Sequence, residues 1–171
     1  GYSKMQSNQI KKLGNALENL RLSELQLELN NCRGFNDEAV LDLVKSISKI
    51  TSLKRFIFGM SELPRNPQDK ISQAGFVKLA KSLERFNGLE FFKLNASKCA
   101  SLDDFALLSF GLMITRLPSL KKLSFDLYNC KRITSQCINE LRNLVSGSGC
   151  QLSVVPNCLA TMNMTDLLRS S

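Results

Sequence analysis

Residues 89–119 read LEFFKLNASKCASLDDFALLSFGLMITRLPS, and residues 120–150 read LKKLSFDLYNCKRITSQCINELRNLVSGSGC. Both stretches are 31 residues long, both start with Leu, and both carry a Cys at their eleventh position. Self-similarity at a fixed period indicates stacked repeats, because one such unit cannot bury its own apolar face. The two stretches therefore predict a solenoid to which the rest of the chain can be aligned.

The same spacing extends toward the N-terminus in a less regular form. An apolar landmark is followed eighteen residues later by Leu in three copies, and a landmark opens a fourth: Phe35 to Leu53, Ile71 to Leu89, Leu102 to Leu120, and Ile133. The landmarks lie 36, 31 and 31 residues apart. The longer interval reflects a five-residue insertion in the segment 59–70, GMSELPRNPQDK. We interpret this segment either as a tolerated surface loop or as a contact loop that adds reach to a binding surface.

Each landmark is followed by a predicted helix. The next residue is a favoured N-cap type in every copy, namely Asn36, Ser72, Asp103 and Thr134. Counted from the landmark, offset 4 is always small and offsets 5, 8 and 12 are apolar, which places them on one helix face. The small residue indicates that the helix closely approaches a neighbouring backbone. Ile10 to Leu20 repeat the face without a preceding strand, so we expect the chain to enter the solenoid in mid-repeat.

After each helix the hydrophobic period changes to two, which predicts a short strand with one buried face. These strands follow Leu53, Leu89 and Leu120, with an earlier copy after Leu22 and a last one at 151–155. Each unit therefore runs strand, turn, helix, turn. Stacked units would pair their strands in a parallel sheet.

The pattern LxxLxL, followed by Cys and a capped helix, resembles leucine-rich repeat proteins, and more narrowly their ribonuclease-inhibitor-like and cysteine-containing classes. The matching segments are Leu29-x-x-Cys32-x-x-Phe35-Asn36, Ala96-x-x-Cys99-x-x-Leu102-Asp103 and Leu127-x-x-Cys130-x-x-Ile133-Thr134. The resemblance implies an α/β solenoid over residues 1–155, with a curved parallel sheet on the concave side, helices on the convex side, and about 4–5 repeats of about 31 residues. Residues 156–171 fit no repeat and are expected to form a C-terminal cap or linker.

The net charge of +8 is concentrated in the middle of the chain. Residues 45–98 carry eleven basic and four acidic side chains. A solvated, soluble face explains this composition, and so does a surface for an acidic partner such as nucleic acid, an acidic protein tail or anionic lipid.

Six cysteines without a CxxC pair, in a chain long enough to bury a core, favour reduced thiols in an intracellular protein, cytoplasmic or nuclear, over three disulfides. The chain has no His, so a Ser-His-Asp or Cys-His arrangement cannot be assembled from it, and it has no GxxxxGK[ST] and no GxGxxG. We therefore expect a protein that is not an enzyme, without catalytic residues, cofactor, metal or small-molecule substrate. No apolar run is long enough to span a bilayer.

Candidate partner-binding residues come from the strand positions that alternate away from the core. They are Arg55, Ile57, Phe91, Lys93, Lys122 and Ser124, joined by Arg65 from the insertion. Ile57 and Phe91 should be near neighbours with a rim of Arg and Lys, a composition that suits a protein interface. Isolated exposed apolar residues are also ordinary on protein surfaces.

Three functions follow from this surface. The leading hypothesis is a protein–protein interaction module or scaffold subunit of a multi-subunit complex, which binds a protein partner or neighbouring subunit through the concave sheet and the 59–70 loop. One alternative is a basic subunit associated with nucleic acid or a ribonucleoprotein through residues 45–98. The other is a substrate-receptor or regulatory domain of a larger enzyme complex.

Overall fold

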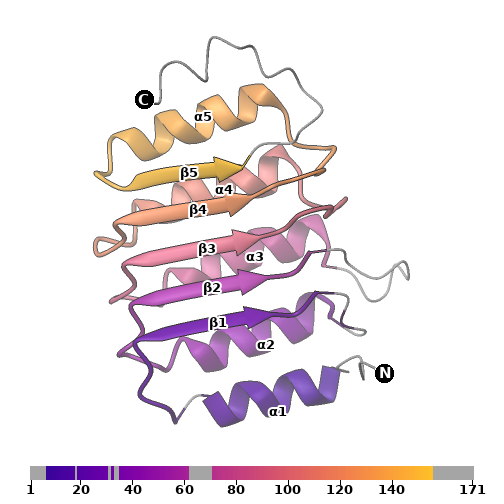
Figure 1. Ribbon diagram of the computed structural model, residues 1–171, viewed down its shortest axis with the longest axis vertical. Helices are drawn as coiled ribbons and strands as arrows, with labels where there is room; N and C mark the ends of the chain where they lie inside the picture. Colours follow the sequence, from indigo (N-terminus) through magenta and orange to yellow (C-terminus); the bar gives the residue numbers. More distant parts are fainter. Residues whose placement is uncertain (1–6, 18, 31, 33–34, 62–70, 156–171) are drawn as a thin grey trace.

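A computed structural model describes residues 7–17, 19–30, 32, 35–61 and 71–155. In this part of the chain helices and strands alternate (Figure 1). The helices are α1 (Ser7–Leu17), α2 (Asp37–Ile47), α3 (Gln73–Leu83), α4 (Asp104–Ile114) and α5 (Ser135–Ser146). The strands are β1 (Glu24–Glu28), β2 (Arg55–Gly59), β3 (Phe91–Asn95), β4 (Lys122–Asp126) and β5 (Gln151–Val155). The last strand has the predicted bounds.

The five strands form one parallel sheet in chain order, β1-β2-β3-β4-β5. The helices form a second layer on one side of the sheet, where each helix packs against the next along the chain (Figure 1). The predicted α/β solenoid is therefore confirmed. We call β1 with α2 unit 1, β2 with α3 unit 2, β3 with α4 unit 3, and β4 with α5 unit 4.

The helices of the four units begin where the sequence predicts. Each predicted N-cap is extended, and its side-chain oxygen accepts the backbone N–H three residues later at 3.0–3.1 Å. Such a cap contributes about 1 kcal/mol to helix stability. The side chains at offsets 5, 8 and 12 are buried in all four units, so the predicted helix face is confirmed as well.

Phenylalanine rings connect the cores of neighbouring units. Consecutive rings lie 5.4–6.3 Å apart between centroids, in the order Phe35, Phe58, Phe56, Phe92, Phe110 and Phe125. All six are fully buried. Each aromatic pair adds about 0.5–1.5 kcal/mol beyond the burial of its area. The chain of rings therefore stabilises the stacking of units as well as each unit itself.

Hydrogen bonds also join the helix N-termini of successive units. The Asp37 carboxylate in unit 1 accepts the backbone N–H of Ser72 at 2.7 Å and its hydroxyl at 2.6 Å. Asp104 in unit 3 accepts the same two groups of Thr134 at 2.8 and 2.7 Å. In both cases the residue after one N-cap holds the N-cap of the next unit.

Between units 2 and 3 the donor and acceptor roles are exchanged, so the residue after the first cap donates and the next cap accepts. Gln73 follows the Ser72 cap, and its Nε2 donates to Asp103 Oδ2 at 2.6 Å. Arg132 Nη2 donates to the same oxygen at 2.9 Å. Because the cap of unit 3 is itself a carboxylate, the residue that faces it is a donor and not another acid.

The register-matched cysteines have a structural role. The thiol of Cys99 donates to the carbonyl of Met60 at 3.2 Å, and that of Cys130 donates to the carbonyl of Ala96 at 3.1 Å. Burial raises the pKa of both thiols. The five cysteines among the described residues form no disulfide with one another, and Cys158 lies outside those residues.

One detail of the helix prediction is wrong, and another holds in some copies only. Leu20 was assigned to the buried face but is 46% exposed, although the residues at the equivalent offset in the next three copies, Ile50, Phe86 and Leu117, are buried. The small residue at offset 4 was expected to face a backbone. At Cys137 this is so, because its Sγ lies 3.5 Å from the backbone oxygen of Asp104 in the preceding unit. At Gly75 the space is filled instead by the Asp37 side chain, whose carboxylate would overlap a Cβ there.

Candidate functional site

The concave face consists of the strand side chains that point away from the helices. The register aligns them in three rows across the sheet. The first row is Glu24, Arg55, Phe91, Lys122 and Gln151; the second is Gln26, Ile57, Lys93, Ser124 and Ser153; the third is Glu28, Gly59, Asn95, Asp126 and Val155. The six candidates from β2, β3 and β4 thus occupy the first two rows, whereas Arg65 lies outside the described residues.

Arg55 and Phe91 form the centre of the first row. The Arg55 guanidinium carbon lies 4.0 Å from the centroid of the Phe91 ring, which is a cation–π contact. Arg55 Nε also lies 3.9 Å from Oε2 of Glu24 on the neighbouring strand β1. The ring remains only half-buried, so this row offers an apolar surface with an oriented cation above it.

Ile57 lies in the second row, directly beside Lys93. Its relation to Phe91 is therefore diagonal, since the direct partners of Phe91 are Arg55 and Lys122. Ile57 and Phe91 are both half-buried, and diagonal neighbours on paired strands lie within reach of an aromatic side chain.

The third row ends in a polar network that the sequence analysis did not identify. Asn30 Oδ1 accepts the backbone N–H of Ser61 at 2.6 Å, and the Ser61 hydroxyl donates to Asn95 Oδ1 at 2.6 Å. The Ser97 hydroxyl donates to Asp126 Oδ1 at 2.8 Å. Short polar residues at the carboxyl ends of consecutive strands were the available signal.

Glu28 fixes a negative charge at the β1 edge of the concave face. Gln26 Nε2 and Asn30 Nδ2 donate to its carboxylate at 3.4 and 3.1 Å. The carboxylate lies over Gly59, where a Cβ would overlap it. The absence of a side chain at Gly59 therefore makes room for the acid, and the β1 edge stays acidic while Lys122 on β4 is basic.

Two of the basic residues next to the strands are already paired. Glu90 Oε2 lies 2.6 Å from Lys121 Nζ, and Glu90 Oε1 lies 3.5 Å from Lys54 Nζ. The hydrogen bond and charge of Lys121, with help from Lys54, hold the pKa of Glu90 below its usual value. Lys54 and Lys121 therefore add less positive potential to this end of the sheet than the sequence implies.

The described residues contain no group of three or more Cys, Asp or Glu side chains arranged to hold a metal ion. None of the described helices is long and apolar enough to cross a membrane. What the concave face offers chemically is recognition, through one oriented cation, two half-buried apolar side chains and a polar row.

No protein-family model and no curated protein matches the chain. Solved structures do match its shape. The leiomodin-1 actin-binding site 2 aligns with a TM-score of 0.58 at 13% identity, covering 98% of this chain and 90% of that one. The tropomodulin C-terminal domain of Caenorhabditis elegans aligns with a TM-score of 0.61 at 14% identity, covering 96% and 90%. The chain therefore has a leucine-rich-repeat type of α/β solenoid fold.

Proposed function

We propose that the chain is a non-enzymatic protein-interaction module whose concave face binds a segment of a partner protein or a neighbouring subunit. The observation that carries the proposal is the Arg55–Phe91 pair, an oriented guanidinium over a half-buried ring in the first row. Arg and aromatic side chains supply most of the binding energy in many protein interfaces. The polar network of the third row, beyond Ile57 and Lys93, would supply directional hydrogen bonds to the same partner.

The similar structures support a protein partner. Leiomodin-1 uses the matched region as an actin-binding site. At 13% identity, the shared fold supports only the proposal that this solenoid is also a docking surface. Actin is therefore a first probe and not an assigned partner.

A paired substitution tests the concave face. Arg55→Glu with Phe91→Ala should abolish capture of proteins that the unmodified chain retains from a cell extract, and of purified actin if actin binds. Arg142→Glu with Phe105→Ala makes the same chemical changes on the helix side and should leave capture intact. Circular dichroism checks that both variants fold. Unchanged capture by the folded concave variant would remove the proposal.

The finer hypotheses extend the same proposal. They are a scaffold role in an intracellular multi-subunit complex, a substrate-receptor or regulatory role within an enzyme complex, and membership of the ribonuclease-inhibitor-like class. Nucleic-acid association through residues 45–98 is the alternative from another class. It predicts that the logarithm of affinity falls linearly with the logarithm of salt concentration. Failure to bind RNA or DNA at low salt would exclude it.

A further inference from the structure

A second surface lies on the helix side of the solenoid, opposite the concave face. It is a groove of about 560 Å³ between α2 and α3, which we call the basic groove. Its lining residues are Leu41, Asp42, Lys45, Lys78, Lys81, Ser82, Glu84 and Arg85. The four cations are exposed, whereas Leu41 and Ser82 are half-buried.

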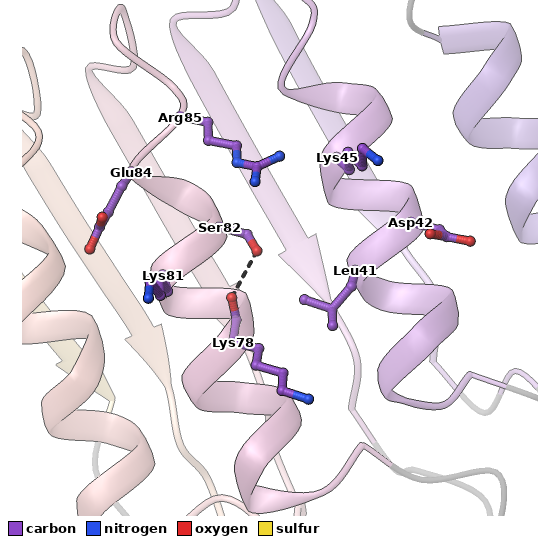
Figure 2. A pocket seen from close by; sticks show the side chains of 8 residues that line it. All are labelled: Leu41, Asp42, Lys45, Lys78, Lys81, Ser82, Glu84 and Arg85. Carbon is purple, nitrogen blue, oxygen red and sulfur yellow. Dashed lines mark hydrogen bonds between the residues drawn. The ribbon is translucent and has the colours of Figure 1, made fainter.

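Figure 2 shows which of these side chains extend into the space between α2 and α3. Lys78 and Arg85 extend from the α3 side toward α2, and Leu41 extends from α2 toward α3. Asp42 points away from the groove on the α1 side, and Glu84 points away on the α4 side. The space between the helices is therefore bordered by cations and an apolar side chain.

Both acids already have cationic partners outside the basic groove. Asp42 Oδ2 lies 3.5 Å from Lys11 Nζ. Arg116 Nη1 donates to both oxygens of Glu84, at 3.1 and 2.9 Å.

The groove cations lack such partners. Within the described part of the chain, no ion pair and no hydrogen bond involves the charged group of Lys45, Lys78, Lys81 or Arg85. Four unneutralised charges on two facing helices repel one another, and a bound anion would relieve that repulsion.

We propose that the basic groove binds an acidic segment of a partner protein. Carboxylates of that segment pair with the cations of α2 and α3, and one of its apolar side chains contacts Leu41. The groove is separate from the concave face, so the solenoid would hold two partners, or two parts of one partner, on opposite sides.

The shape and borders of the groove favour a protein segment over other polyanions. A nucleic acid duplex is wider than the space between two adjacent helices and would meet Asp42 and Glu84 at the margins. Single strands are usually held by stacking on aromatic rings, and no aromatic side chain lines the groove. A bilayer surface is too flat to reach Leu41 between the helices.

The test measures fluorescence anisotropy of a labelled synthetic peptide rich in Glu, with Leu at every fourth position. Lys78→Gln with Arg85→Gln should weaken its binding about tenfold, the sum of two ion pairs at about 0.7 kcal/mol each. Lys131→Gln with Arg142→Gln removes the same net charge elsewhere and should change binding by less than about twofold. Replacing Leu by Ser in the peptide should also weaken binding.

Further probes separate the remaining outcomes. Equal losses in the two variants, or no binding of the peptide at low salt, would overturn the proposal. So would a dependence on Lys78 and Arg85 shown only by single-stranded RNA or by phosphatidylserine-containing vesicles. The concave variant, Arg55→Glu with Phe91→Ala, should bind the peptide normally, so the two proposed surfaces can fail independently.

Discussion

The contact between Gln73 and Asp103 allows a sharp test of how successive units are joined. Gln73→Asp would remove a 2.6 Å hydrogen bond to the Asp103 carboxylate, which is worth about 1 kcal/mol at a partly exposed position. It would also place two carboxylates side by side, at a cost of about 1 kcal/mol in well-solvated surroundings. Arg132, 2.9 Å from the same oxygen, offsets part of that repulsion. We expect a loss of about 1–2 kcal/mol in the free energy of unfolding.

A second substitution should reverse the effect. Asp103→Ser in the same chain reproduces the arrangement of Asp37 with Ser72, in which a carboxylate accepts the N–H and the hydroxyl of the next cap. Urea unfolding of the unmodified chain, both single variants and the double variant, followed by circular dichroism, gives the coupling energy. We expect a favourable coupling of about 1–2 kcal/mol. If the losses in the two single variants add to that of the double variant within about 0.5 kcal/mol, the idea that an acid must face a donor is refuted, because the effects of substituting interacting residues are not additive.

Three other predictions concern the core, a turn and a thiol. Phe92→Ala should cost about 3–5 kcal/mol in urea unfolding, because the buried ring packs against Phe56 and Phe110; a loss below about 1 kcal/mol would contradict this. Gly149→Ala should lower the free energy of unfolding by about 1–2 kcal/mol, because Gly149 has a φ of 72°. Gly147→Ala should be neutral or slightly stabilising, and equal effects of the two substitutions would contradict the prediction. Burial raises the pKa of Cys137 from 9.0 to about 12. Iodoacetamide at pH 9 should therefore label Cys137 only after unfolding, and labelling of the folded chain would count against its burial. The free energy of unfolding should fall above about pH 9, because the thiol of the unfolded chain loses its proton at a lower pH than the thiol of the folded chain.

The regular part of the fold could be predicted because its pattern lies within one unit and recurs from unit to unit. The cap, the small residue and the three apolar offsets recur at fixed distances from each landmark, so errors in one copy are corrected by the others. The prediction failed at Leu20, whose counterparts in later copies are buried. Among the described elements α1 packs against α2 alone, so Leu20 lacks the second neighbour that those later copies have.

Contacts between units were harder to predict, because they depend on register. The sequence placed Ile57 and Phe91 on one face, but only the strand pairing shows that their direct neighbours are Lys93 and Arg55. Part of the basic groove could have been predicted from the sequence, because Lys45 and Lys81 both lie ten residues after their landmarks. The outward turn of Asp42 and Glu84, which leaves the groove cationic, depends on Lys11 and Arg116 in flanking units.

The alternation of acid and donor at the helix N-termini makes the units non-interchangeable. A unit whose helix begins with Asp37 or Asp104 must be followed by a unit with a hydroxyl cap, and the carboxylate cap Asp103 must be preceded by a unit with a donor such as Gln73. Deleting unit 2 would join Asp37 to Asp103 and create a clash of charge. Duplicating unit 3 would join Asp104 to a second copy of Asp103, with the same result. Recombination within such an array is therefore restricted to junctions where an acid faces a donor. The order of the units is thus determined by pairs of residues that lie about thirty positions apart.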